Sequence, residues 1–165
     1  MKTRSPETGA PSETPWLTEE EQQLWRAHLE VTRLLDYQLE RELQPLGLAL
    51  NDYTILVELS ESPDHRRRMT DLAAATLQSK SRLSHQITRM ENAGLVVRED
   101  CPGDRRGLYA VLTEQGMETM RRVAPHHVRS VREHFIDRLD AGQIRQLRDA
   151  LAPIAEHLRR LRGRG

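Results

Sequence analysis

Apolar residues recur along most of this chain at helical spacing, and only a short central stretch has the pattern of strands. A capping box at Thr18 opens a helical pattern that continues to about Leu43. Another helical pattern starts at Thr113, and a second capping box at Asp140 precedes the last one. The sequence therefore predicts a mainly α protein with one small β-hairpin.

The most informative part of the chain lies within residues 50–113 and starts with two short helical patterns separated by a tight turn. The first has Thr70 as its expected N-cap, and the second follows Ser79, whose hydroxyl can accept a backbone N–H. The apolar stripe of the second pattern consists of Leu83, Ile87 and Met90. Its opposite face consists of hydrogen-bond donors, namely Ser81, Arg82, His85, Thr88, Arg89 and Asn92. Such a face is typical of a helix that reads the major groove, and an ordinary solvated helix is the alternative.

Two short strands follow at residues 95–98 and 108–112, joined by a turn at 101–107 in which Pro and Gly set the reversal. The turn carries Arg105 and Arg106, which suit a phosphate backbone or a narrow minor groove because its negative potential attracts guanidinium groups. Two helices followed by a hairpin are the order of a winged helix-turn-helix. We therefore expect double-stranded DNA as a partner.

This stretch resembles the multiple-antibiotic-resistance regulator (MarR) family of bacterial transcription factors. The matching residues are Leu72-Ala73, the run from Ser79 to Val97, and Asp104-Arg105-Arg106 followed by Leu112-Thr113-Glu114-Gln115-Gly116. In that family an Asp-x-Arg element, here Asp104 and Arg106, places its arginine in the minor groove. The two departures are Leu77, at a turn position that is often glycine, and His85, where many members have arginine.

The resemblance implies a set of DNA-binding residues. Those of the recognition helix are Ser79, Lys80, Ser81, Arg82, His85 and Arg89, and those of the wing are Asp104, Arg105 and Arg106. We expect Ser81, Arg82 and His85 to face base edges. Lys80 and Arg89 are expected to meet the flanking phosphates, and Asp104 to hold an arginine in place.

The charge of the chain is balanced overall, with 25 basic and 25 acidic residues, but it is unevenly distributed. Residues 1–64 carry a net charge of −8, whereas residues 65–106 and 107–165 carry +4 each. Positive charge therefore gathers where the DNA-binding pattern lies. A further cluster of Arg66, Arg67 and Arg68 either grips phosphates or belongs to a solvated loop.

The last helical pattern carries a heptad seam, which needs a partner helix. The seam consists of Ile144, Leu147, Leu151, Ile154, Leu158 and Leu161. Packing within the chain is one possibility. The resemblance favours a homodimer, in which residues 16–48 and 114–165 interlock two subunits. A twofold dimer places two recognition helices about 34–36 Å apart, so we expect a pseudo-palindromic operator.

The sequence shows no catalytic triad motif, phosphate-binding glycine loop or zinc-protease motif, so we expect neither enzyme activity nor a cofactor. A helix spreads His126, His127 and His134 too far apart for one metal ion, so we expect no metal site. Cys101 lies near arginines that favour a redox-active thiolate. The adjacent Asp100 opposes it, so an inert thiol is the other reading.

Residues 1–15 lack the apolar segment of a signal peptide, and we expect a disordered tail followed by a single domain at 16–165. No apolar run approaches the roughly 20 residues that cross a bilayer. We therefore expect a cytoplasmic protein with no membrane contact.

The resemblance also implies a cleft for a small aromatic or anionic ligand that releases the DNA. The candidate side chains for this cleft are Trp25, His28, Arg33, Tyr37 and Tyr53, each of which could instead serve in packing. We interpret the chain as a dimeric, sequence-specific transcriptional regulator, and the resemblance implies a repressor. The alternatives are a non-specific architectural DNA-binding protein and a ligand- or metal-sensing protein-interaction module.

Overall fold

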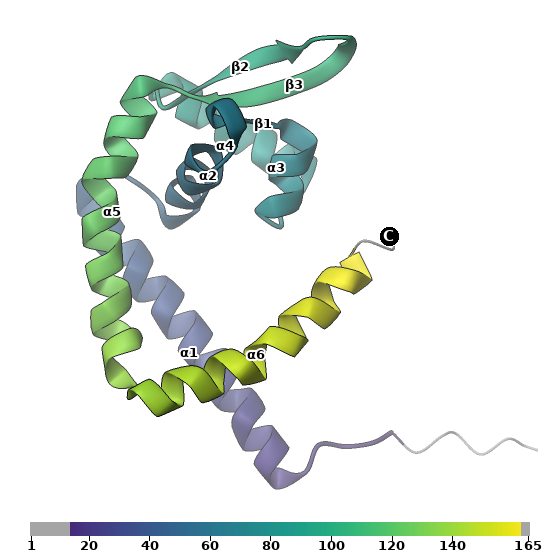
Figure 1. Cartoon of the computed structure of the whole chain (residues 1–165), viewed down its shortest axis with the longest axis vertical. Helices are drawn as coiled ribbons and strands as arrows, with labels where there is room; N and C mark the ends of the chain where they lie inside the picture. Colours follow the sequence, from purple (N-terminus) through teal and green to yellow (C-terminus); the bar gives the residue numbers. More distant parts are fainter. Residues whose placement is uncertain (1–13, 163–165) are drawn as a thin grey trace, which may run out of the picture. The chain divides into compact units, whose positions relative to one another are not determined.

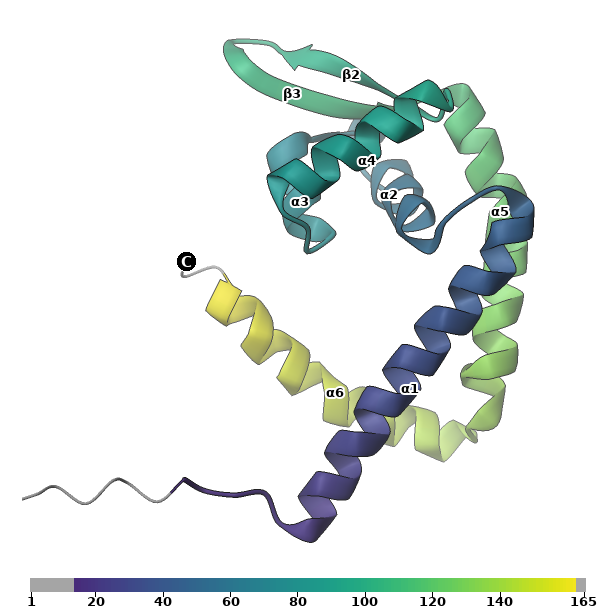
Figure 2. The same ribbon diagram turned by 180° about the vertical axis from the view of Figure 1, so that it is seen from behind.

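The computed structural model describes residues 14–162 and confirms a mainly α fold with a small sheet. The helices are α1 (Glu19–Leu43), α2 (Leu50–Ser60), α3 (Met69–Ala75), α4 (Lys80–Asn92), α5 (Glu114–His134) and α6 (Ala141–Arg162). The strands are β1 (Arg66–Arg68), β2 (Val96–Cys101) and β3 (Asp104–Leu112), and short 3-10 helices lie at Gln44–Leu46, Pro63–His65 and Ile136–Arg138. Figures 1 and 2 show from two sides that β2 and β3 form a long hairpin next to α3 and α4.

The chain divides into two compact units, one that ends at Leu34 and one that begins at Leu35. Most of α1 belongs to the first unit, where Leu24, Trp25 and Val31 are exposed. The second unit contains the remaining elements. It therefore holds every residue that the sequence assigns to DNA.

Local capping signals start α1, α4, α5 and α6 where the sequence predicts. The N–H of Thr18 donates to Glu21 Oε2 over 2.7 Å, and the N–H of Glu21 donates to Thr18 Oγ1 over 3.3 Å. Ser79 Oγ accepts from the N–H of Arg82, which caps α4. Side-chain caps also begin α5 and α6. Each such cap stabilises its helix by about 1 kcal/mol.

Two local predictions are wrong. α3 begins at Met69, so Thr70 lies inside the first turn and its hydroxyl donates to the neighbouring aspartate instead of capping the helix. The hairpin turn is also shorter than predicted, because β2 runs to Cys101 and β3 starts at Asp104. Gly103 makes this tight reversal with a φ of +80°. Backbone pairing extends both strands through polar residues that do not alternate with apolar ones. The hydrophobic pattern of the sequence therefore predicts strands that are too short.

A third strand, β1, has no counterpart among the predicted elements. It pairs antiparallel with β3, with Arg66 opposite Val111 and Arg68 opposite Tyr109, which gives the sheet order β1-β3-β2. Three consecutive arginines have neither the branched nor the aromatic character of strand residues, so propensity gives no sign of it. The strand connects α2 and α3 to the hairpin.

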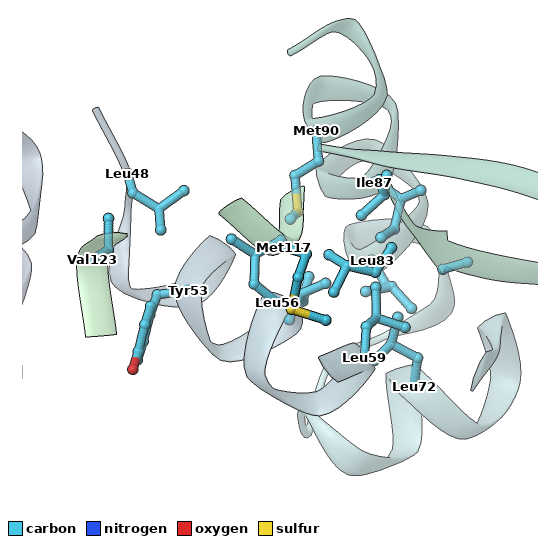
Figure 3. Packing of buried hydrophobic residues seen from close by; sticks show 14 of the residues in the cluster. Leu48, Tyr53, Leu56, Leu59, Leu72, Leu83, Ile87, Met90, Met117 and Val123 are labelled. Atoms are coloured by element: carbon cyan, nitrogen blue, oxygen red, sulfur yellow. The ribbon is translucent and has the colours of Figure 1, made fainter. Parts of the chain in front are cut away.

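The hydrophobic core lies among α2, α3, α4 and α5 and holds α4 in place (Figure 3). Its fully buried side chains include Leu56, Leu59, Leu72, Leu83 and Ile87. Met117 and Val123 extend the cluster onto α5. The apolar stripe predicted for α4 is thus confirmed. Each of these side chains contributes about 1.5–3 kcal/mol by leaving water, and the opposite face of α4 is turned outward.

α6 has the reverse character, because none of its residues is buried. Five of the six seam positions, Ile144, Leu151, Ile154, Leu158 and Leu161, are between 36% and 58% exposed. The described residues of the unit that contains α6 therefore do not cover the heptad seam. Neither α6 nor any other helix within residues 14–162 is long and apolar enough to span a membrane.

Candidate DNA-binding surface

The turn between α3 and α4 requires a left-handed residue, and Leu77 occupies that position. Its φ is +57°, and its side chain is 77% exposed. The N–H of Leu77 donates to the carbonyl of Ala74, and that of Gln78 donates to the carbonyl of Ala73, which is the Schellman pattern at the end of a helix. Leucine adopts this conformation at a cost of about 1–2 kcal/mol. The turn therefore forms with leucine at a position that is often glycine in the family that the sequence resembles.

The outward face of α4 collects the residues predicted for the recognition helix. Exposed side chains on it are Lys80, Ser81, Arg82, His85 and Arg89. Residues 80–90 include no carboxylate, so the face offers donors and positive charge along about three turns. Figure 2 shows α4 lying below the hairpin with its length open to view.

A buried carboxylate of α2 lies behind this face. Asp52 is 8% exposed and accepts from Gln86 Nε2 over 2.8 Å and from Arg89 Nη2 over 2.6 Å. The Arg89 side chain remains 64% exposed, and the bond to Asp52 uses one of the five N–H donors of its guanidinium. The sequence pattern does not reveal Asp52 or Gln86 as part of the site. They are more than 30 residues apart in the chain and meet only in the fold.

A second tie to α4 comes from the hairpin, through Arg98 of β2. Arg98 Nη2 donates to the carbonyl of Ser84 over 2.7 Å and to Thr88 Oγ1 over 3.0 Å, and Nη1 donates to Glu91 Oε2. Glu91 Oε1 also accepts from the backbone N–H of Arg98 over 2.9 Å. The Arg98 side chain is 21% exposed. The sequence pattern does not single out this arginine, because its partners lie 7 to 14 positions away on another element.

The cluster of Arg66, Arg67 and Arg68 forms strand β1 instead of a solvated loop. Each arginine has an acidic partner, and the three partners are Asp64, Glu58 and Asp104 in that order. The guanidinium groups of Arg66 and Arg68 also lie 5.0 and 5.8 Å from the centre of the Tyr109 ring. In the last of these pairs, Arg68 Nη1 donates to Asp104 Oδ2 over 3.1 Å.

The hairpin tip carries the residues predicted for the wing. Arg105 and Arg106 belong to β3, but their side chains fall outside the part that the structure describes. Gly107 follows at a close approach, because a Cβ there would lie 2.6 Å from Asp104 Oδ2 and 3.0 Å from the Cβ of Cys101. Any side chain at position 107 would displace Asp104, which contacts Arg68.

A cavity of about 290 Å³ lies between α4 and the hairpin. Its polar lining consists of Arg68, Thr70, Lys80, Ser84, Arg98 and Asp104. Three cations face one carboxylate, so the cavity is positive on balance. The cavity lies next to both α4 and the hairpin, so it belongs to the candidate DNA-binding surface.

Comparison with known proteins decides which family has this arrangement. A family model described as MarR family matches residues 46–107. The crystal structure of AbsC, a MarR family transcriptional regulator from Streptomyces coelicolor, shares 69% identity over 88% of this chain and 99% of its own, with a TM-score of 0.84. This chain belongs to the MarR family.

Two further relatives of this MarR-family protein bear on its role. Sco3205 of Streptomyces coelicolor, whose structure was solved in complex with DNA, is 46% identical over 90% of this chain and 93% of its own, with a TM-score of 0.84. The transcriptional repressor Mb2911 of Mycobacterium bovis is 30% identical over 73% of this chain and 85% of its own. MarR-family members are transcription regulators and not enzymes. The chain is therefore a DNA-binding transcriptional regulator.

The candidate effector residues of this MarR-family protein are divided between its two units. Trp25, His28 and Arg33 lie in the first, where the Trp25 and His28 rings stack with centroids 5.6 Å apart. Tyr37 and Tyr53 lie in the second, where Tyr37 is 66% exposed and Tyr53 is buried. A ligand cleft built from these residues stays a prediction.

The histidines considered as metal ligands have other neighbours in the MarR-family fold. His134 Nε2 lies 2.6 Å from Glu42 Oε1. A hydrogen bond from Ser130, together with those from Gln38 and His134, lowers the pKa of Glu42 to about 2. The His127 ring packs against Tyr53 at 4.5 Å, and burial lowers the pKa of His127. Within the described residues no three potential metal ligands come together.

Cys101, at the end of β2, is only 4% exposed. A redox-sensing thiol needs access to its oxidant as well as a positive environment. The burial therefore favours the inert thiol over the redox switch.

Proposed function

We propose that this MarR-family regulator is a repressor that binds a pseudo-palindromic operator as a homodimer. One observation carries the proposal, namely that an exposed donor face on α4 occurs together with an uncovered apolar seam on α6. The first surface matches the major groove of DNA, and the second matches another helix.

On the DNA side, α4 would lie in the major groove and the hairpin tip in the adjacent minor groove. Ser81, Arg82 and His85 would then face base edges, and Arg106 would enter the minor groove. The sugar-phosphate backbone separates the two grooves, so one strand would pass over the cavity between α4 and the hairpin. The positive lining of that cavity, with Lys80 at its edge, supports this path.

On the protein side, a second copy of the chain would cover the α6 seam. Burying apolar surface yields about 25 cal/mol per Å², so five half-exposed Leu and Ile side chains represent a large gain that a monomer leaves unused. A twofold dimer would present two α4 helices about one DNA turn apart. The operator would therefore contain two inverted half-sites.

The direction of regulation is inferred from similarity. Mb2911, named a transcriptional repressor, is 30% identical to this chain over most of both sequences. We therefore propose that binding lowers transcription from the operator-bearing promoter. In vitro transcription with and without the protein tests this point, and a rise in transcript would replace the repressor with an activator.

Release by a small aromatic or anionic ligand is part of the same proposal. His127 Nδ1 is buried and has no hydrogen-bond partner within the described residues, and the ring packs against buried Tyr53. An unpaired buried nitrogen beside an aromatic ring is a group that a ligand could satisfy. Adding benzoate or phenol to the operator complex tests this, and the Tyr53→Ala variant should respond less than the wild type.

Selection of genomic fragments with the purified protein tests the proposal as a whole. The expected result is enrichment of fragments that share an inverted repeat with half-sites about 10 base pairs apart. Equal binding to a random duplex would favour an architectural protein. Failure to retain any fragment would favour a protein-interaction module.

A further inference from the structure

We propose that Arg98 is a positioning residue that fixes the wing relative to the recognition helix. The inference rests on the proposed DNA-binding mode, since it concerns how two DNA-contacting elements are held at one angle. Arg98 is not among the residues expected to face DNA. It acts through the elements that it joins.

The contacts of Arg98 run along one flank of α4. Ser84, Thr88 and Glu91 are spaced i, i+4 and i+7, so they form a row that covers about two turns, or about 10 Å, of the helix. One guanidinium group contacts all three. A contact with a single residue would allow the helix to pivot, whereas a row of contacts fixes the direction of its axis. The carbonyl of Ser84 adds a main-chain attachment that cannot move independently of the helix.

The Arg98–Glu91 pair also holds the backbone of strand β2. Glu91 accepts from both the backbone N–H of Arg98 and its guanidinium, so the pair holds the β2 backbone and not only a side chain. Both side chains are mostly buried, at 21% and 27% exposure. Removing either partner would leave the other charge poorly solvated and unpaired, which is costly.

The sheet order explains why the hairpin depends on this contact. β2 is an edge strand that pairs with β3, while β3 is also supported by β1. The β1 side is therefore anchored through the sheet. On the opposite side, Arg98 provides a polar side-chain connection between β2 and α4.

The groove spacing of the DNA duplex explains why the angle between α4 and the wing should affect binding. The spacing between adjacent major and minor grooves is set by the duplex, so α4 and the wing must enter them together. A wing that is already at the right angle loses less freedom on binding, which increases affinity without any new contact. Arg98 should thus matter for operator binding through the elements that it joins, beyond any attraction between its charge and a phosphate strand that passes over the cavity.

The first test separates geometry from charge. Arg98→Lys keeps the positive charge, but an ammonium group cannot contact Ser84, Thr88 and Glu91 at once as the planar guanidinium does. We expect Arg98→Lys to lose about tenfold in operator affinity, close to the loss in Arg98→Gln. The control is Arg121→Gln, which removes an exposed arginine of α5 that lies 3.5 Å from Glu114. It should change affinity by less than about threefold. Wild-type affinity in Arg98→Lys would overturn the inference.

The second test asks whether Arg98 acts through the wing. Arg106→Ala is made in the wild type and in Arg98→Lys, and the four affinities form a double-mutant cycle. If Arg98 positions the wing, removing Arg106 should cost several-fold less in the Arg98→Lys background, because the wing is already misplaced. A merely structural or electrostatic role predicts that the two losses multiply. Multiplicative losses would overturn the inference.

A DNA-free measurement separates this inference from the proposed function. Hydrogen–deuterium exchange should become faster across residues 96–112 in Arg98→Lys, while α2 and α5 keep wild-type protection. Unchanged exchange in the hairpin overturns the inference even if the protein binds its operator. Failure of the wild type to bind DNA overturns the proposed function instead. If Arg98→Lys does not fold, Glu91→Gln, which keeps the side-chain shape, takes its place in all three measurements.

Discussion

The winged region, residues 50–113, and helix α6 use apolar residues in opposite ways. In the winged region Leu56, Leu72 and Leu83 are completely buried, and the exposed side of α4 is polar. In α6 most of the apolar side chains of the seam are themselves exposed. One region buries its own hydrophobic surface, and the other leaves most of that surface exposed.

If α6 associates with a second copy as proposed, folding and assembly are encoded in separate parts of this chain. Substitutions in the core of the winged region should affect the free energy of unfolding at any protein concentration. Substitutions in the α6 seam should instead act through association, so their effect should depend on concentration.

The largest effect is expected for Leu158→Asp in the seam. An aspartate there would be buried without a partner in the dimer, which costs about 3–5 kcal/mol. Light scattering at several concentrations should show a shift towards monomer, and operator affinity should fall because one half-site is lost. Ala152→Asp is the matched control, since Ala152 is exposed on α6 but lies off the seam. A wild-type protein that is monomeric at micromolar concentration and still binds tightly would contradict the dimer.

A somewhat smaller effect is expected for Leu83→Ala in the core. Leu83 is fully buried, so the truncation should lower the free energy of unfolding by about 3 kcal/mol. Urea denaturation measures the change, while light scattering should show an unchanged oligomeric state for the folded protein. Leu77→Ala removes the same atoms from an exposed position and should cost less than about 0.5 kcal/mol. Equal losses in the two variants would mean that the core is not where the structure places it.

The outward face of α4 should show effects on DNA binding and little on stability. Arg82→Ala should cost about 1–3 kcal/mol on the preferred operator and flatten the preference among sequences. Lys80→Ala should weaken binding to all sequences equally and reduce the salt slope by about one. Titrations on the operator and on a scrambled duplex at several salt concentrations separate these outcomes. Full sequence preference in both variants would place the recognition face elsewhere.

The smallest effect is expected at the turn before α4. Leu77→Gly relieves a left-handed conformation and removes an exposed side chain, so it should stabilise the protein by up to about 1 kcal/mol. Ala74→Gly is the contrasting variant, because Ala74 is exposed within α3 and glycine there should cost about 1 kcal/mol. Thermal denaturation distinguishes the signs. A loss of stability in Leu77→Gly would show that the Leu77 side chain has a packing role.

The sequence predicts those parts of the fold that depend on neighbouring residues. The caps at Thr18 and Ser79 and the apolar stripe of α4 are local patterns, so they are visible before folding. Strand β1 is not, because its arginines pair with β3 some 40 residues later in the chain. Hydrogen bonding across the sheet, and not side-chain preference, makes them a strand.

The candidate site follows the same rule. The exposed side chains of α4 can be listed from the helical period alone, since the core fixes which face is turned inward. The side chains that hold that face in place cannot be listed in this way. Asp52 meets Arg89, and Arg98 meets Glu91, only because α2 and β2 are folded onto opposite flanks of α4. Polar contacts between distant residues leave no periodic trace in a sequence.

The burial of Cys101 gives this protein an internal reporter of hairpin opening. It is the only cysteine in the chain, and it lies at the end of β2, where it pairs with Asp104 across the turn. A thiol reagent can reach its sulfur only when the structure around the end of β2 opens, so the labelling rate measures how often that happens. The unmodified protein therefore allows the opening of the wing to be timed with and without DNA, with no engineered probe.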